Sequence, residues 1–146
     1  MIEKQLIGWT SPASTVEVEK GRLRFFAQAI GETNPLYSDE EGARAEGYRS
    51  IPIPPTFLFC LEMENSSSSR VLEILNVGMD RILHGEQFFR YHQAVCVGDC
   101  ITFQSKVSDI YSRKGGTLEF IVLESTATNQ DGVLVGEMRS SIIVRH

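Results

Sequence analysis

The chain has 146 residues, of which 42% are hydrophobic and 23% are charged, and its formal net charge is −5. These values are typical of a globular protein, and they argue against nucleic acid or an anionic membrane as the main partner. The length suits a single domain, residues 1–146, that buries its own core.

Targeting and metal-binding signals are absent from the sequence. The start, MIEKQLIGWT, has no basic segment followed by an apolar run, so no signal peptide is predicted. No stretch is apolar and long enough to predict a transmembrane helix. Cys60, Cys96 and Cys100 form no CxxC motif and no ligand-spaced set with histidine. We therefore expect no disulfide, no metal and no cofactor, and a reducing cytoplasm as the compartment.

The first half of the chain has helical periodicity. In KGRLRFFAQAIG, Leu23, Phe26, Ala27 and Ile30 recur at helical spacing, and Gly31 follows as a stop signal. The segment SDEEGARAEG predicts a short second helix. Its expected capping box is Ser38 with Glu41, and Gly47 is expected to end it.

A third helix is predicted in IPIPPTFLFCLEME, where Pro54 and Pro55 suit a first turn. Its residues 57–61 are apolar on every side, which is typical of a fully buried helix. The next segment, NSSSSR at residues 65–70, is predicted to be a flexible loop.

The second half predicts four strands: EQFFRYHQAV, CITFQSKVSDIY, TLEFIVLESTATN and VLVGEMRSSIIVRH. The intervening Gly-Asp, Gly-Gly and Asp-Gly pairs are turn signals, so we expect an antiparallel meander. Long strands after one wholly apolar helix predict an α+β fold. In it, a curved sheet of about five or six strands wraps around a long central helix.

The loop GETNPLY, residues 31–37, carries the candidate chemistry. It is short and lies between two predicted helices, so its side chains have fixed positions. Glu32 can accept a proton, Asn34 can position a substrate, and Tyr37 can donate a hydrogen bond. A structural turn with a solvated Glu32 and a packed Tyr37 is the alternative that the residues themselves leave open.

FFAQAIGETNPLYSDEEGARAEGY followed by IPIPPTFLF resembles the MaoC-like (R)-specific hydratase and dehydratase family, which has the hot-dog fold. The likeness continues through LHGEQFFRYHQAVCVGD and NQDG to MRSSIIVR, so it covers nearly the whole chain. These later segments look most like the N-terminal halves of two-module dehydratases. The resemblance implies a hot-dog domain and reversible addition or removal of water at the β-carbon of an acyl thioester.

The sequence departs from that family at its two catalytic positions. The family motif is Gly-Asp-x-Asn-Pro-(aliphatic)-His, and Glu32 stands at the Asp position and Tyr37 at the His position. Since tyrosine has a reference pKa of about 10 against about 6.5 for histidine, Tyr37 is a poor proton shuttle at neutral pH.

In that family, backbone N–H groups at the start of the apolar helix polarise the thioester carbonyl, and here Pro55, Thr56 and Phe57 match that place. Because proline lacks an N–H, the expected donors are Thr56 and Phe57; a proline that merely starts a core helix is the alternative. Cys60, one turn further along, is expected either to line an acyl tunnel or to act as a small hydrophobe. His84, just before the next predicted strand, could form a relocated acid/base pair with Glu86, and a structural role is the alternative.

The resemblance implies three functions in decreasing order of preference. The first is a MaoC-like acyl-thioester dehydratase or (R)-specific enoyl-CoA hydratase that uses Glu32 and Tyr37. The second is a non-catalytic, substrate-binding subunit of a heterodimeric dehydratase. The third is a hot-dog thioesterase, which would need a carboxylate near the helix start, whereas Glu62 and Glu64 lie further along. The expected partners are an acyl-CoA or acyl-carrier-protein thioester and a second hot-dog subunit, identical or MaoC-like.

Overall fold

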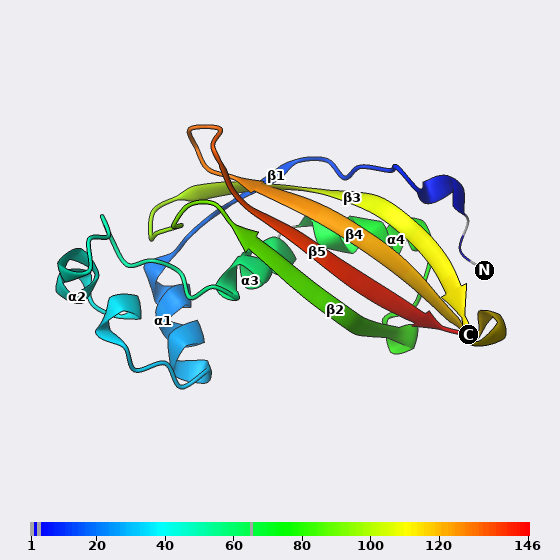
Figure 1. Cartoon of the computed structure of the whole chain (residues 1–146), viewed down its shortest axis with the longest axis horizontal. Helices are drawn as coiled ribbons and strands as arrows, with labels where there is room; N and C mark the ends of the chain where they lie inside the picture. Colours follow the sequence, from blue (N-terminus) through cyan, green and yellow to red (C-terminus); the bar gives the residue numbers. More distant parts are fainter. Residues whose placement is uncertain (1, 3, 65) are drawn as a thin grey trace.

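The computed structural model describes residue 2, residues 4–64 and residues 66–146. A curved antiparallel sheet runs the length of the molecule, with strand order β1-β3-β4-β5-β2 (Figure 1). The five strands are β1 (Ser14–Glu17), β2 (Ile82–Tyr91), β3 (Cys100–Arg113), β4 (Leu118–Thr128) and β5 (Leu134–Arg145).

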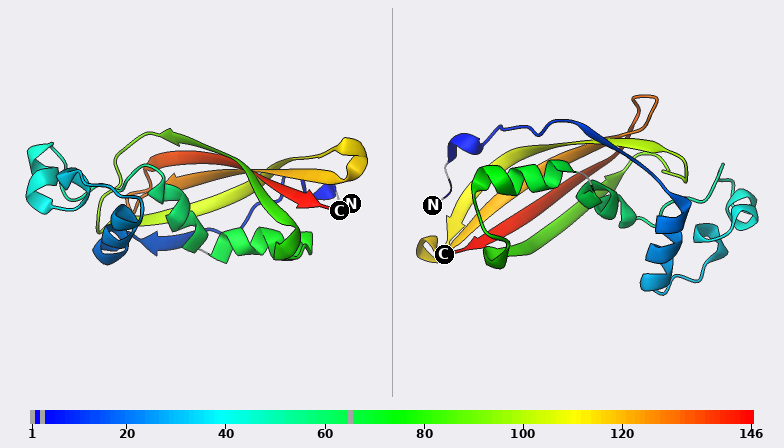
Figure 2. Two further views of the ribbon diagram at one scale, coloured as in Figure 1. Left: turned by 90° about the horizontal axis from the view of Figure 1, so that it is seen from below. Right: turned by 180° about the vertical axis from the view of Figure 1, so that it is seen from behind.

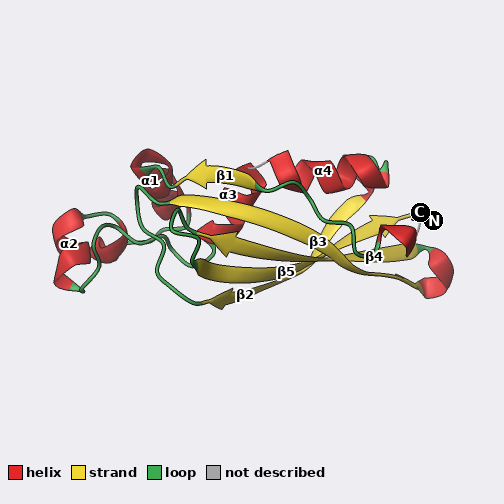
Figure 3. Ribbon diagram, turned by 90° about the horizontal axis from the view of Figure 1, so that it is seen from above, coloured by secondary structure: helices red, strands yellow, loops and turns green. Residues whose placement is uncertain are grey.

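The helices lie on one side and at one end of this sheet. Helices α3 (Phe57–Glu64) and α4 (Ser66–Leu75) pack along one face, the inner face, as two further views show (Figure 2). No described helix covers the outer face (Figure 3). Helices α1 (Lys20–Ala29) and α2 (Glu40–Ala45) lie beyond the end of the sheet that is far from both termini. The described residues also form four 3-10 helices: η1 (Lys4–Leu6), η2 (Pro35–Tyr37), η3 (Met79–Arg81) and η4 (Lys114–Gly116).

Two hydrophobic clusters fill the space between the helices and the sheet. Leu58 and Leu61 of α3 pack with Phe103 in the first cluster. Val71 and Leu75 of α4 pack with Ile121 in the second. On the sheet, alternate residues of β3 from Ile101 to Val107 are buried, so that one side of the strand faces these helices. The predicted α+β hot-dog fold is confirmed, although the helical part on the inner face consists of two helices, α3 and α4, and not of the one long central helix that was expected.

Two further predictions about the helices are wrong. The serine-rich segment is helical from Ser66 onward as the first turns of α4, while residue 65 lies outside the described residues. Serine has low helix propensity, but Val71, Leu72 and Leu75 gain enough buried contact to stabilise the helix. The cap of α2 is Asp39, whose Oδ2 accepts the Gly42 N–H at 2.7 Å, and not Ser38. Ser38 instead donates its N–H to the Pro35 carbonyl.

The strands differ from the predicted meander at β2. This strand pairs with β5, whereas only β3, β4 and β5 follow one another as hairpins. It ends at Tyr91 because the chain beyond it pairs with the segment before α3: Ile53 N–H donates to the Val95 carbonyl, and Val97 N–H to the Ile51 carbonyl. The short strand β1, which pairs with β3, was not predicted.

Candidate functional site

The loop after α1 begins with a Schellman motif, which fixes the backbone of Glu32. Gly31 has φ +70°, the left-handed conformation that glycine adopts without strain. Its N–H donates to the Gln28 carbonyl at 3.1 Å, and the Glu32 N–H donates to the Ala27 carbonyl at 2.8 Å. The α1 terminus therefore determines where Glu32 lies.

Helix α2 ends in the same way and fixes Tyr48. Gly47 has φ +87°, its N–H donates to the Arg44 carbonyl at 3.0 Å, and the Tyr48 N–H donates to the Ala43 carbonyl at 3.0 Å. The two helices thus deliver Glu32 and Tyr48 from equivalent positions, one residue past the left-handed glycine.

Asn34 and Glu32 hold the loop between these helices. Asn34 Oδ1 accepts the Leu36 N–H at 3.0 Å and so caps η2. Glu32 Oε1 accepts the Asn34 N–H at 2.8 Å. One carboxylate oxygen of Glu32 therefore accepts a hydrogen bond from the loop backbone. This agrees with the alternative, stated from the sequence, that the loop is a structural turn.

Tyr37 lines a cavity of about 350 Å³, the site cavity, between this loop, the segment before α3 and the end of β2. Tyr48, Pro55, Tyr91 and His92 also line it. Burial raises the pKa of the Tyr37 hydroxyl, and nearby Tyr48 and the Glu32 carboxylate raise it further. The Tyr37 hydroxyl therefore stays protonated at neutral pH and serves as a hydrogen-bond donor.

The start of α3 forms one wall of the site cavity. Tyr91 donates its hydroxyl hydrogen to the Pro55 carbonyl at 2.8 Å, which ties the end of β2 to the helix start. The Phe57 N–H donates to the Pro54 carbonyl at 2.9 Å, and Phe57 packs on Phe26. Among the hydrogen bonds of the described residues none uses the Thr56 N–H, so of the two expected donors only Thr56 is available.

The other predicted site residues lie away from the site cavity. Cys60 packs against the first core cluster, and burial raises the pKa of its thiol. His84 stacks on Phe59 with ring centroids 5.3 Å apart, at a second cavity on the inner face. A bulge in β2 separates His84 from Glu86, which lies in a hollow of the outer face. The two side chains therefore do not form an acid/base pair.

The carboxylates considered for a thioesterase are also used elsewhere. Glu62 is buried on the inner face, where it accepts a hydrogen bond from Ser105. Glu64 pairs with Arg22 at 2.6 Å. Neither carboxylate lies among the described residues that line the site cavity.

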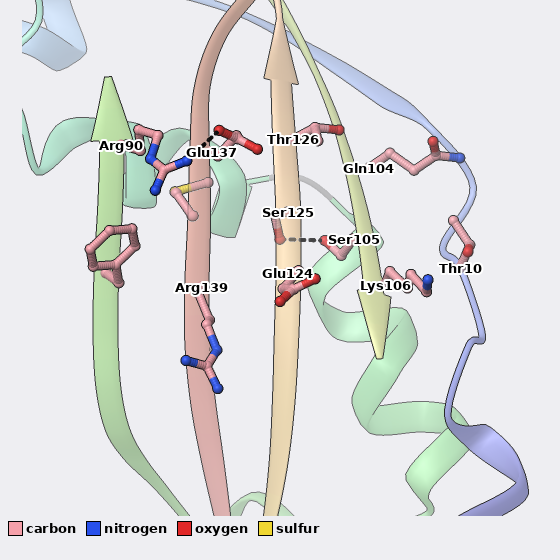
Figure 4. A pocket seen from close by; sticks show the side chains of 12 residues that line it. Thr10, Arg90, Gln104, Ser105, Lys106, Glu124, Ser125, Thr126, Glu137 and Arg139 are labelled. Atoms are coloured by element: carbon pink, nitrogen blue, oxygen red, sulfur yellow. Dashed lines mark hydrogen bonds and ion pairs between the residues drawn. The ribbon is translucent and has the colours of Figure 1, made fainter. Parts of the chain in front are cut away.

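Sequence analysis did not place Tyr48, Tyr91 or His92 at this site. His92 Nε2 lies 2.8 Å from Glu137 Oε2. Glu137 Oε2 also lies 3.9 Å from Arg90 Nη1. Both residues line a hollow of the outer face, which Arg139 lines as well (Figure 4). Only the position of Tyr91 and His92 at a strand end could have signalled them, and that signal is weak.

The site cavity can bind a polar carbonyl group on a largely apolar surface. Its donors are the hydroxyls of Tyr37 and Tyr48, while Ile53, Leu58 and Val135 supply apolar contact. The described residues that line it include no Asp or Glu. Within the described part of the chain there is no cluster of three metal-ligating side chains, and no helix is long and apolar enough to cross a membrane.

Residues 5–138 match the family described as "FAS1-like, dehydratase domain region". A "UPF0336 protein" of Thermobifida fusca is 35% identical over 129 residues, which is 88% of this chain and 84% of that protein.

Solved structures agree with this match. The Mycobacterium tuberculosis structure described as the C-terminally truncated HadBC (3R-hydroxyacyl-ACP dehydratase) complex has a TM-score of 0.83 and 25% identity, over 94% of this chain and 96% of that one. A "MaoC-like dehydratase" has a TM-score of 0.84 and 23% identity, over 96% of this chain and 42% of that longer one. The chain therefore belongs to the FAS1-like dehydratase region family, within the MaoC-like hot-dog proteins that its sequence resembles.

Proposed function

We propose that this protein is the acyl-thioester-binding subunit of a MaoC-like dehydratase, paired with a second hot-dog subunit that supplies the catalytic Asp and His. The observation that carries this proposal is the composition of the site cavity, whose described lining includes tyrosine hydroxyls, apolar side chains and His92 but no carboxylate. Such a wall can hold a thioester carbonyl, but it has no carboxylate base to activate water.

The Glu32 and Tyr37 side chains of the loop support the same conclusion. Glu32 stands where the family has its Asp, but its Oε1 accepts a loop N–H. Tyr37 stands where the family has its His, and its raised pKa keeps it a donor. HadBC, a dehydratase that is by its description a complex, is the kind of assembly that we propose for this chain.

A self-sufficient dehydratase or hydratase is the second candidate. Glu32 lies close enough to Tyr37 for its charge to raise the Tyr37 pKa, so the two side chains could act on one substrate. In that case Glu32 is the base, Tyr37 the donor, Asn34 the positioning residue and the Thr56 N–H the oxyanion donor. The carrier, coenzyme A or acyl carrier protein, and the cytoplasmic, single-domain and cofactor-free predictions stay predictions.

Binding and turnover measured on one sample separate the two candidates. Saturated acyl-CoA is titrated into the purified protein by calorimetry, and enoyl-CoA hydration is followed spectroscopically. We expect binding without measurable hydration, because a complete acid/base pair contributes roughly 10²- to 10⁴-fold to the rate. Turnover at the full rate that Glu32→Gln abolishes would instead establish the self-sufficient enzyme.

A genomic neighbour provides the positive test. A co-expressed hot-dog protein with the intact Asp-x-Asn-Pro-x-His motif is expected to co-purify with this chain, and hydration is expected to appear only in the mixture. Activity of that neighbour alone, unchanged by adding this chain, would contradict the proposal.

A further inference from the structure

His92 connects the site cavity with the outer face of the sheet. The residue directly follows β2 and lines the site cavity. Its backbone N–H donates to the carbonyl of Val135, another lining residue, at 2.9 Å. The imidazole is therefore held at the cavity wall, and the binding of a thioester carbonyl does not by itself require an imidazole.

Glu137 of β5 holds this imidazole from outside the site cavity. His92 Nε2 lies 2.8 Å from Glu137 Oε2. Glu137 lines the hollow of the outer face and is not among the described residues that line the site cavity. Arg90, which pairs with Glu137 in the register of β2 and β5, lies 3.9 Å from the same oxygen through its Nη1. One ring nitrogen of His92 is thus used by a group that does not belong to the cavity.

The bond to Glu137 determines what the other ring nitrogen can do. A carboxylate only accepts hydrogen bonds, so Nε2 carries the hydrogen of this bond, and in the neutral imidazole Nδ1 is then an acceptor. Among the hydrogen bonds of the described residues none uses Nδ1 of His92. The cavity wall therefore offers hydroxyl donors at Tyr37 and Tyr48 and a nitrogen acceptor at His92.

A nitrogen acceptor recognises a hydrogen-bond donor of the ligand. The acyl part of a dehydratase substrate has one donor near its carbonyl group, the hydroxyl on the β-carbon. Only the α-carbon separates that carbon from the carbonyl carbon, so both groups fit in one cavity of about 350 Å³. The other nearby donor is the first amide N–H of the carrier arm, on the sulfur side of the thioester.

We propose that His92, with its ring positioned by Glu137, is a specificity-determining residue whose Nδ1 accepts a hydrogen bond from the β-hydroxyl of the acyl thioester. The inference rests on the proposed function, because the thioester carbonyl occupies the same cavity. It implies that the subunit distinguishes the hydroxylated form of the substrate from forms without that donor. A keto oxygen at the same carbon only accepts, and a methylene group does neither.

The test is calorimetric titration of the purified protein with acyl-CoA probes of equal chain length. The probes are the saturated acyl-CoA, the two enantiomers of 3-hydroxyacyl-CoA and the 3-ketoacyl-CoA. We expect one 3-hydroxy enantiomer to bind roughly tenfold tighter than the saturated probe, because it gives Nδ1 a partner. The 3-keto probe is expected to bind no tighter than the saturated one.

Substitutions at His92 and Glu137 separate recognition from folding, since a half-exposed pair of this kind contributes little to stability. His92→Gln keeps an N–H that can reach Glu137 but has no acceptor in the place of Nδ1, so it should lose the preference. His92→Asn places an amide oxygen near that position and should keep part of it. Glu137→Ala releases the ring and should reduce the preference while leaving affinity for the saturated probe unchanged.

His84→Gln is the matched control. His84 stacks on Phe59 and is not among the described residues that line the site cavity, so this variant is expected to keep the full preference.

The outcomes separate this inference from the proposed function. Equal affinity for the hydroxylated and saturated probes, or a preference that survives His92→Gln, overturns the inference and leaves the proposed function standing. Equal weakening of every probe by His92→Gln would show that Nδ1 binds the carrier amide and would overturn the β-hydroxyl assignment. Failure of all probes to bind overturns both the inference and the proposed function.

Discussion

Tyr37 and Glu32 occupy a loop whose backbone frame is retained, although the two side chains differ from the Asp and His of the resembled family. Gly31, Asn34 and Pro35 still build the Schellman motif and the capped turn. The Glu32 carboxylate accepts a loop N–H, and the Tyr37 hydroxyl lines the site cavity. The loop backbone therefore keeps the conformation that positions residues 32 and 37, whereas the side chains at these two positions differ from those of the family.

Replacing Tyr37 by Phe tests the role of its hydroxyl as a donor. Since the hydroxyl stays protonated and lines the site cavity, Tyr37→Phe should weaken acyl-CoA binding by about three- to tenfold. Tyr111→Phe, on the stacked Tyr111–Phe120 pair outside the site cavity, is the control and should leave binding unchanged. Calorimetry measures both, and an equal effect of the two substitutions would remove Tyr37 from the site.

The buried carboxyl of Glu62 should make stability depend on pH. Its pKa is raised in the folded state, mainly by burial, so the folded protein holds a proton that the unfolded chain has released. The free energy of unfolding should therefore fall as pH rises from the ordinary carboxyl pKa through the raised one. Glu62→Gln removes this titration, so it should narrow the difference in stability between about pH 4 and about pH 8. Urea denaturation measures this, and an unchanged pH profile would contradict the assignment.

The site residues were predictable only where they are neighbours in the sequence. Residues 31–37 are contiguous, so the sequence pointed to Glu32, Asn34 and Tyr37 together. Tyr48, Tyr91 and His92 reach the same cavity through tertiary contacts between distant segments, and no local spacing indicates such contacts. In the sequence, Glu62 is only one residue of a predicted helix. Its hydrogen bond with Ser105 forms only when α3 packs on the sheet.

At the scale of the elements, the helix ends position the site. Gly31 is left-handed, so Gly31→Ala should destabilise the protein by about 1 kcal/mol and weaken acyl-CoA binding by shifting the residues after it. Gly21, in α1, has no left-handed φ and open space around its Cα, so Gly21→Ala should instead stabilise by about 0.5 kcal/mol. Chemical denaturation compares the two, and equal effects would show that the Schellman geometry does not matter.

The elements themselves were largely predictable, but their partners were not. Periodicity located α1, α3 and the long strands because each has a clear apolar face or run. It failed for α4, whose serine-rich start gives way to Val71, Leu72 and Leu75, and whose stability comes from packing. It also failed for the pairing of β2 with β5, because the pairing of strands that are distant in the sequence leaves no periodic signal.

At the scale of the whole molecule, β2 is an edge of the sheet that no described strand covers. Leu83, Phe88 and Tyr91 on this strand are 45%, 54% and 47% exposed. An exposed apolar edge strand favours pairing with a second subunit, as the proposed function requires.

Phe88→Lys should therefore weaken subunit association by at least roughly tenfold, because a charged edge opposes strand pairing. Val133→Lys, in the loop before β5, is the control with a comparable apolar-to-charged change and should leave association intact. Analytical ultracentrifugation across concentrations measures both. Association that is unaffected by Phe88→Lys would locate the interface elsewhere.

The most direct test of the central claim is to measure acyl-CoA binding and enoyl-CoA hydration on the same purified sample, with its oligomeric state determined in parallel. Our account predicts that the protein binds saturated acyl-CoA, in a manner weakened by Tyr37→Phe, and hydrates enoyl-CoA only when the catalytic partner is added. Hydration by the protein alone, at a rate that Glu32→Gln abolishes, would contradict the account and make the Glu32 and Tyr37 pair a catalytic site.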